Sequence, residues 1–232
     1  MVNSVAPART DPPRRGRPPK AQAQLSRAAI RDAALEVIDN EGIGALAMRS
    51  VSRVLGVDAK SLYHHVAGKD DLLDAVAEHV LEQLRIPAPT GSIETDLRTL
   101  AHEFRRVTLA HPEAATLVLT RQLSSMAGLA PIEALLTVLR SAGSTPEEAV
   151  HLLRTLLATL IGTLLREVSA GPLFGTSDPD EIAQRQHTLE TSGLPQVASA
   201  APYLARYDRD REFDYTLDLI IELVKARLGP GK

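Results

Sequence analysis

A chain of 232 residues without cysteine can form neither a disulfide nor a thiolate metal site, and we identify no secretory leader and no apolar run that would cross a bilayer. Hydrophobic residues make up 44% of the chain and aromatic residues only 3%, a composition that favours helices over strands. The net charge of −3 hides an asymmetry, because residues 1–69 hold 11 basic and 6 acidic side chains. We therefore expect a cytoplasmic, all-α protein with one end suited to a polyanion.

Residues 1–24 are rich in proline and arginine and lack large apolar side chains, which predicts a flexible basic arm. Within this arm, an Arg-Gly-Arg-Pro sequence resembles the core of an AT-hook, in which Arg15 and Arg17 would enter a narrow minor groove. A basic tail that contacts phosphates without fixed order explains the same composition. Both interpretations assign the arm to DNA.

Three short helices are predicted after the arm, over residues 26–41, 48–55 and 58–66. Gly56 separates the second from the third and can take the positive φ that such a turn requires. This spacing is typical of a helix-turn-helix. The side chains expected to pack the unit together are Val51, Val54, Leu55, Val57 and Leu62.

Local signals mark most of the ends of these helices. Ser26 and Asp58 are N-cap residues, and Gly42 is placed to end the first helix in the left-handed conformation. Ala47 precedes the second helix where a hydroxyl N-cap is usual, so that helix is expected to lose about 1 kcal/mol of capping.

A fourth helix is predicted from Gly68 to about Arg85, and the proline- and glycine-containing residues 86–95 form a linker. We accordingly divide the chain into a DNA-binding domain over 25–85 and a second helical domain over 86–232. The strongest helices of the second domain are Leu97–Leu109, Ile132–Arg140, Pro146 to about Ala170, and Glu212–Leu228. Residues 171–209 show only a weak helical stretch, around Ile182–Leu189.

Motifs at fixed intervals in the first domain resemble those of the TetR family of transcription factors. They are Ala33-Ala34-Leu35, Gly42, Met48-Arg49, Leu55-Gly56-Val57, Ser61-Leu62-Tyr63-His64-His65-Val66 and Lys69-Asp70-Asp71-Leu72-Leu73. More loosely, the second domain resembles the tetracycline repressor subclass. The resemblance implies an N-terminal helix-turn-helix domain and a C-terminal ligand-binding and dimerisation domain. It further implies a homodimeric regulator, most simply a repressor, that binds palindromic operator DNA and is released by a small-molecule inducer.

In the light of this resemblance, the 58–66 helix is the recognition helix, lying in the major groove. Lys60 is the expected base reader, because its ammonium can donate to guanine, while Ser61 suits a base edge or a phosphate. The other contacts expected from the match are Arg49, Ala59, Tyr63, His64, His65 and Lys69. Two of these have simpler interpretations: Tyr63 as a packed aromatic, and His64 as a partly buried filler in place of a family tryptophan.

The ligand pocket is expected near Phe104, His111, Leu117, Leu135, Leu157 and Ile161. His111 corresponds to a histidine that binds a metal–antibiotic complex in the tetracycline repressor. However, Ala114 and Arg166 replace a hydrogen-bonding and an acidic pocket residue. We therefore expect no bound metal and no cofactor, and a helix cap is the alternative role of His111.

The helices over 146–170 and 212–228 are apolar on more than one face, which predicts a four-helix interface between two subunits. The residues assigned to it are Leu152, Leu153, Leu156, Leu157, Leu160, Ile161, Leu164 and Leu165, with Phe213, Leu217, Ile220, Ile221, Val224 and Leu228. A core within one chain is the alternative.

Two other classes of function fit the sequence less well. An enzyme on the C-terminal bundle is disfavoured, because the sequence contains no clustered carboxylates, no paired nucleophile and base, and no phosphate-binding loop. A constitutive architectural DNA-binding protein would use the basic arm, but it would not need the large acidic second domain.

Overall fold

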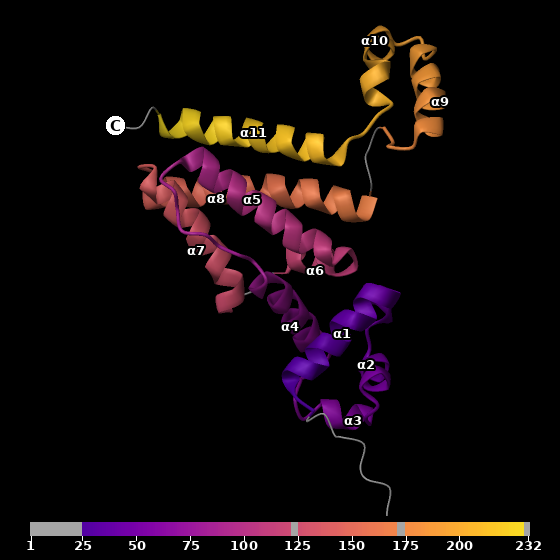
Figure 1. The fold of residues 1–232 in the computed structure, drawn as a ribbon, viewed down its shortest axis with the longest axis vertical. Coiled ribbons are helices and arrows are strands. Elements are labelled where there is room, and N and C mark those ends of the chain that lie inside the picture. The colour runs from indigo at the N-terminus through magenta and orange to yellow at the C-terminus, as the bar shows by residue number, and fades with distance from the viewer. Residues whose placement is uncertain (1–24, 122–124, 171–174, 230–232) are drawn as a thin grey trace, which may run out of the picture.

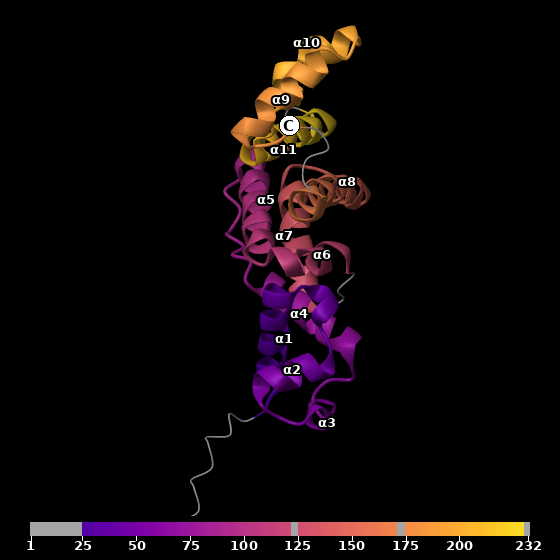
Figure 2. The ribbon, with the colours of Figure 1, turned by 90° about the vertical axis from the view of Figure 1, so that its right-hand side faces the viewer.

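The computed structural model describes residues 25–121, 125–170 and 175–229, which form helices and one isolated β-bridge but no strand. The helices build an elongated molecule (Figures 1 and 2). The N-terminal helices occupy one end, and the C-terminal helices occupy the middle and the other end. This architecture confirms the predicted all-α fold. The predicted arm, residues 1–24, lies outside the described residues.

The N-terminal unit contains α1 (Arg27–Glu41), η1 (Ile43–Ala45), α2 (Met48–Leu55), α3 (Ala59–Leu62) and α4 (Lys69–Glu82). The first three predicted helices are all present, although the third is much shorter than expected. Helix α4 ends before the predicted residue 85, because the chain tightens into hydrogen-bonded turns at residues 83 and 84. Figure 1 shows α2 and α3 at the end of the molecule remote from the C-terminal helices.

The capping predictions are mostly confirmed. Ser26 Oγ accepts a hydrogen bond from the Ala29 amide at 3.1 Å. Gly56 takes the left-handed conformation (φ 67°, ψ 31°), whereas Gly42 has a positive φ of 81° with an extended ψ of 163°, so the left-handed prediction was wrong there. Ala47 provides no side-chain cap. Ser50 Oγ instead accepts from the Ala47 amide at 2.9 Å, which partly replaces the missing interaction.

The packing of α2 differs from expectation. Val51 and Leu62 are fully buried, and Leu55 is partly buried, but Val54 and Val57 are 40% and 36% exposed. Helices α2 and α3 lie at one end of the molecule (Figure 1), and these two side chains are exposed there. The expectation that Val54 and Val57 pack in the core was therefore wrong.

The C-terminal bundle contains α5 (Ile93–Ala110), α6 (Pro112–Thr120), α7 (Met126–Ser141), α8 (Pro146–Leu165) and α11 (Arg209–Leu228). A π-helical turn, η2, extends α8 over Arg166–Ala170. The predicted helices are present, but α5 and α7 begin earlier than expected, because serine side chains cap them at residues 92 and 125. Helix α6 was not predicted as a separate element.

A helical hairpin of α9 (Pro179–Glu190) and α10 (Pro195–Leu204) projects from the bundle, as both views show (Figures 1 and 2). Its base is closed by the bridge between Thr176 and Arg206. Gly175 is required there: its φ is +90°, and a Cβ would lie 2.5 Å from the Arg206 carbonyl oxygen. The weak helical stretch predicted around Ile182–Leu189 lies within α9, whereas α10 was not predicted.

The described residues form two hydrophobic cores. The first contains side chains that precede the predicted linker, residues 86–95, and side chains that follow it. Side chains of α1, α2, α3 and α4 pack there against α5 and α6, which contribute Val107, Ala114, Leu117 and Val118. The second core lies among α5, α6, α7, α8 and α11. Phe104 packs against both. Helix α6 therefore lies between the N-terminal unit and the bundle.

Helix α8 and the turn that extends it form an unusually apolar segment. The helical segment Pro146–Val168 is long and apolar enough to cross a bilayer, by length and composition only, so the expectation that the chain has no such run was wrong. Only 28% of its apolar window is buried within the chain. Such a helix is weak support for a membrane span, because a core or interface helix has the same composition.

Candidate DNA-binding surface and ligand cavity

The segment predicted as the recognition helix, residues 58–66, is called the recognition segment below. It contains a single turn of helix, α3, followed by turns. Asp58 caps α3 by accepting from the Lys60 amide at 2.7 Å. Beyond Leu62 the hydrogen bonds are mostly of the i to i−3 type, such as His65 N to Leu62 O at 2.9 Å. The predicted helix over 58–66 is therefore wrong in extent, since residues 63–65 form a tightened turn.

Buried Leu62 and Val66 hold this segment against the core, so the side chains between them point outward. Tyr63 is 56% exposed and His64 is also exposed, which disfavours the packed-aromatic and buried-filler interpretations. Of the described DNA-contact candidates, Arg49, Lys60, Tyr63, His64, His65 and Lys69 are exposed, and Ala59 and Ser61 are partly buried. Arg15 and Arg17 lie outside the described residues.

A charged cluster fixes the recognition segment to α1 and α4. The Arg27 guanidinium donates to both carboxylate oxygens of Asp71 and, at 3.3 Å, to the His65 carbonyl oxygen. Asp71 also accepts from the Ala67 amide at 2.8 Å. The hydrogen bond from Arg27 lowers the pKa of Asp71 and raises that of Arg27, so both groups stay charged. These hydrogen bonds connect the N-terminal end of α4 to the turn that carries His65.

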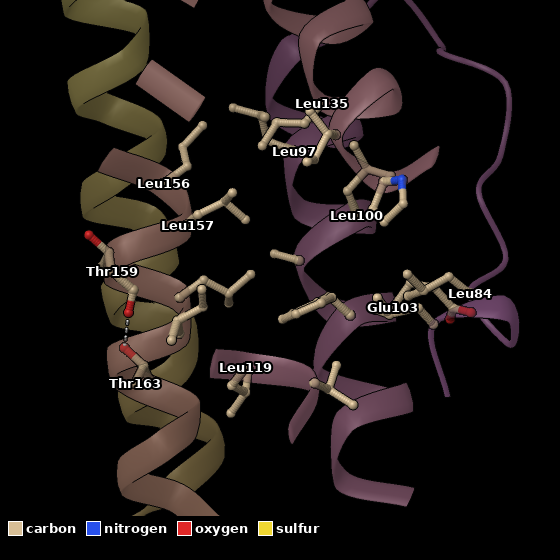
Figure 3. Close-up of a pocket in the computed structure, with 18 of the residues that line it drawn as sticks. Leu84, Leu97, Leu100, Glu103, Leu119, Leu135, Leu156, Leu157, Thr159 and Thr163 are labelled. Atoms are coloured by element: carbon tan, nitrogen blue, oxygen red, sulfur yellow. Dashed lines mark hydrogen bonds between the residues drawn. The ribbon is translucent and has the colours of Figure 1, made fainter. Parts of the chain in front are cut away.

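A cavity of about 640 Å³ lies in the C-terminal bundle. Figure 3 shows Leu97 and Leu100 of α5 and Leu135 of α7 facing Leu156 and Leu157 of α8 across it. Leu81, in the last turn of α4, and Leu84, which follows the end of that helix, also line the cavity. Its size and apolar lining are typical of small-molecule sites.

The structure divides the predicted ligand-binding residues into two groups. Phe104, Leu135, Leu157 and Ile161 line the cavity. His111 and Leu117 are not among its lining residues. His111 lies at the junction of α5 and α6, with its Nδ1 2.9 Å from Asp39 Oδ2 of α1, and it makes no side-chain capping hydrogen bond. Leu117 is buried in the first core.

Several lining residues were missed on three helices: α6 was not predicted, the end of α4 was assigned to the DNA-binding domain alone, and only Phe104 of the predicted α5 was assigned to the pocket. These residues include Leu81, Leu84, Leu97, Leu100, Leu119, Thr120 and Arg121. A usable signal was present, since Pro112 and Glu113 form a good first helical turn before the apolar run Ala114–Leu119. Among the described residues, no group of three or more potential ligands is placed to hold a metal ion.

The polar groups of the cavity are few. Thr159 Oγ donates to the Thr155 carbonyl at 3.0 Å and Thr163 Oγ to the Thr159 carbonyl at 2.9 Å, the second bond being drawn in Figure 3. Glu103 accepts two hydrogen bonds from Arg106 and one from the Arg85 amide. The bonds from Arg106 are the main reason that the pKa of Glu103 falls to about 2.

The Glu103→Gln variant is expected to be less stable than the wild type at pH 7, by about 2 kcal/mol. A carboxyl whose pKa is depressed by folding contributes stability above its unfolded pKa of 4.5 and loses it as the pH falls towards about 2. The difference between variant and wild type should therefore shrink between pH 4.5 and pH 2. Urea unfolding at several pH values measures it, and a difference independent of pH would contradict the assignment.

A row of apolar side chains on α11 is left uncovered. Tyr215, Leu219 and Leu223 recur every fourth residue and are 63%, 51% and 53% exposed. By contrast, α11 residues assigned to a subunit interface from the sequence, including Phe213 and Leu217, are buried within the chain. The full set buried in this way is Leu152, Leu153, Leu156, Leu164, Phe213, Leu217, Ile220, Ile221 and Val224. The intrachain alternative was correct for those residues.

Comparison with known proteins agrees with this arrangement. Residues 30–76 match the family described as bacterial regulatory proteins, tetR family, and residues 87–228 match the tetracyclin repressor-like C-terminal domain. An HTH-type transcriptional regulator of Saccharopolyspora erythraea is 39% identical over 120 residues, so the match spans about half the length of that relative (51% of each chain).

Two further similarities extend over most of the chain. The HTH-type transcriptional repressor DrrR1 of Streptomyces coeruleorubidus is 30% identical over 93% of this chain and 84% of that protein. The crystal structure of the Streptomyces coelicolor TetR family protein ActR in complex with actinorhodin has a TM-score of 0.80 and 28% identity, over 90% of this chain and 100% of ActR. With both domains matched in order and more than half of the sequence covered by the C-terminal family alone, the chain belongs to the tetR family of bacterial regulatory proteins.

Proposed function

We propose that this protein is a ligand-responsive transcriptional repressor, rather than an enzyme, that acts on double-stranded DNA in the cytoplasm. The observation that carries the proposal is the position of α4. Its N-terminal end is joined to the exposed recognition segment through Asp71 and Arg27, and its C-terminal end lines the cavity through Leu81. The repressor name of DrrR1 and the actinorhodin bound to ActR support the two halves of this proposal.

The DNA-binding form is proposed to be a homodimer joined through α8 and α11. The exposed row Tyr215, Leu219 and Leu223 supports this, as do the small residues Ala158 and Gly162 on the exposed side of α8. Burial against a second copy, rather than against lipid, also accounts for the apolar character of α8. Two-fold symmetry would place two recognition segments about 34–36 Å apart, which matches successive major grooves of a palindromic operator.

Release is proposed to follow from a shift in α4. A ligand that fills the cavity displaces the C-terminal end of α4, and the cluster of Arg27 and Asp71 passes the movement to the recognition segment. The ligand must bind the released state more tightly than the DNA-bound state, by roughly 5 kcal/mol for a complete switch.

Footprinting tests the function as a whole. The purified protein is expected to protect one palindromic region of the DNA that flanks its own gene, and small apolar molecules are then screened for loss of protection. Binding that is insensitive to sequence and to every such molecule would favour a constitutive architectural DNA-binding protein instead.

The Lys60→Ala variant is expected to weaken cognate binding by about 1–3 kcal/mol while leaving non-specific binding nearly unchanged, because base contacts supply discrimination. Electrophoretic mobility shifts on operator and scrambled DNA measure both affinities. Arg53→Ala is the matched control, since Arg53 is also exposed but pairs with Glu41. An equal loss on both DNAs would make Lys60 a phosphate contact.

The arm over residues 1–24 is proposed to bind phosphates or the minor groove through Arg15 and Arg17. Its deletion is expected to weaken operator binding and to reduce the slope of log affinity against log salt by about 0.9 for each phosphate that the arm neutralises. If the arm acts as a minor-groove hook, its deletion should lower the affinity more for an operator flanked by A·T pairs than for one flanked by G·C pairs. An unchanged salt slope would exclude the arm from DNA binding.

A further inference from the structure

The C-terminal end of α6 borders the cavity and contacts α4 at the same time. Val118, Leu119, Thr120 and Arg121 all line the cavity. Arg121 also pairs with α4, because its Nε donates to Asp74 Oδ1 at 2.5 Å and its Nη2 lies 3.4 Å from the Asp70 carbonyl oxygen. One side chain thus belongs both to the cavity wall and to the contact between α6 and α4.

The hydrogen-bonding capacity of the two charged lining residues differs. Both carboxylate oxygens of Glu103 are occupied by Arg106, and one of them also accepts from the Arg85 amide. Arg121, in contrast, binds one oxygen of Asp74, and its Nη1 has no acceptor within the described ranges. Among the described residues, Arg121 therefore has unused donors, whereas Glu103 has no unused oxygen. A guanidinium can bind a carboxylate through two parallel hydrogen bonds. The charge available to a ligand is therefore positive.

Solvent exposure favours an exchange of partners at Arg121. The Arg121 side chain is 26% exposed, whereas Asp74 is 45% and Asp70 is 92% exposed. If Arg121 turned to a ligand, water would hydrate the Asp74 carboxylate, because 45% of that side chain is already exposed. An acidic group inside the apolar cavity would have no comparable alternative, since an unpaired buried charge is strongly unfavourable.

We propose that the cavity takes apolar ligands that carry one acidic group, and that Arg121 recognises this group by giving up Asp74. The inference rests on the proposed ligand-binding function and names its ligand class. It also specifies the switch, because loss of the Arg121–Asp74 pair frees the half of α4 that Asp71 and Arg27 connect to His65. A neutral ligand of the same shape would leave that pair intact.

A pair of dyes with the same ring system tests the ligand class. 8-Anilinonaphthalene-1-sulfonate carries an acidic group, and N-phenyl-1-naphthylamine lacks it. Both are titrated by fluorescence into the full-length protein, with each dye used to compete against the other so that only the shared site is counted. We expect the sulfonate to bind at least about tenfold more tightly, the usual effect of a charge-assisted hydrogen bond.

Three variants assign the preference to Arg121. Arg121→Gln should lower the affinity for the sulfonate about tenfold or more and change that for the neutral dye by less than about twofold. Asp74→Asn should tighten binding of the sulfonate alone, because it removes the competing carboxylate. Arg227→Gln is the matched control, since Arg227 is ion-paired with Glu148 and does not line the cavity.

Hydrogen exchange supplies the second measurement. The sulfonate, but not the neutral dye, should accelerate exchange of the α4 amides in the wild type. If both dyes bind and Arg121→Gln affects them equally, the cavity binds ligands but the inference about acidic groups is overturned. If neither dye binds the shared site, both the inference and the proposed ligand cavity are rejected.

Discussion

Phe213→Ala is expected to lower the free energy of unfolding by about 3–5 kcal/mol, the usual range for removal of a buried aromatic ring. Phe213 is 2% exposed and lies in the second core. Its ring packs edge to face against His102, with centroids 5.2 Å apart, and the Arg105 guanidinium lies 4.7 Å from its centroid. The substitution removes these ring interactions together with the buried apolar area.

Urea unfolding followed by far-ultraviolet circular dichroism measures the change at one protein concentration, since dimerisation would make stability concentration-dependent. Tyr203→Ala is the control, because Tyr203 is 82% exposed and its truncation should change stability by less than about 0.5 kcal/mol. A decrease below about 1 kcal/mol for Phe213→Ala would contradict the packing described for the second core.

A double substitution, Leu219→Asp with Leu223→Asp, is expected to convert the proposed dimer to a monomer and to weaken operator binding about 100-fold or more. Both side chains are about half exposed in the protomer, so the charges should leave its fold intact. In a subunit interface, however, each unpaired carboxylate would be desolvated at a cost of several kcal/mol. The DNA affinity falls because two half-sites would then be bound independently.

Light scattering at micromolar protein concentration gives the mass of each variant. Leu194→Asp is the control, because Leu194 is 58% exposed but lies between α9 and α10, away from the row on α11. A wild-type protein of monomeric mass, or a double variant that remains dimeric, would contradict the proposed interface.

The sequence predicted those parts of the fold that depend on local chemistry. Ser26 and Gly56 mark helix ends through their own hydrogen bonding and backbone freedom, and both behave as expected. The extent of α3 was not predictable in this way. Its boundary depends on Leu62 and Val66 being held in the core, which is a tertiary effect.

The candidate site was predicted less completely than the fold. The exposed DNA-contact candidates followed from motif positions, whereas the cavity depends on which faces of several helices meet. His111 illustrates the difference: its position beside Pro112 suggested a ligand contact or a cap, but its partner is Asp39, 72 positions earlier in the chain. No local pattern indicates such a long-range pairing.

The shared first core has a consequence for how members of such a family can be recombined. Val107, Ala114, Leu117 and Val118 follow the linker in sequence but complete the hydrophobic interior beneath α1 and α4. In a chimera joined at residue 85, α1 to α4 of one protein would therefore pack against α5 and α6 of another. The first core would be mismatched, although the junction lies between the two family matches. Grafting of the DNA-binding unit onto another effector domain should succeed only when residues on α5 and α6 are exchanged together with it, so the transferable module is discontinuous in sequence.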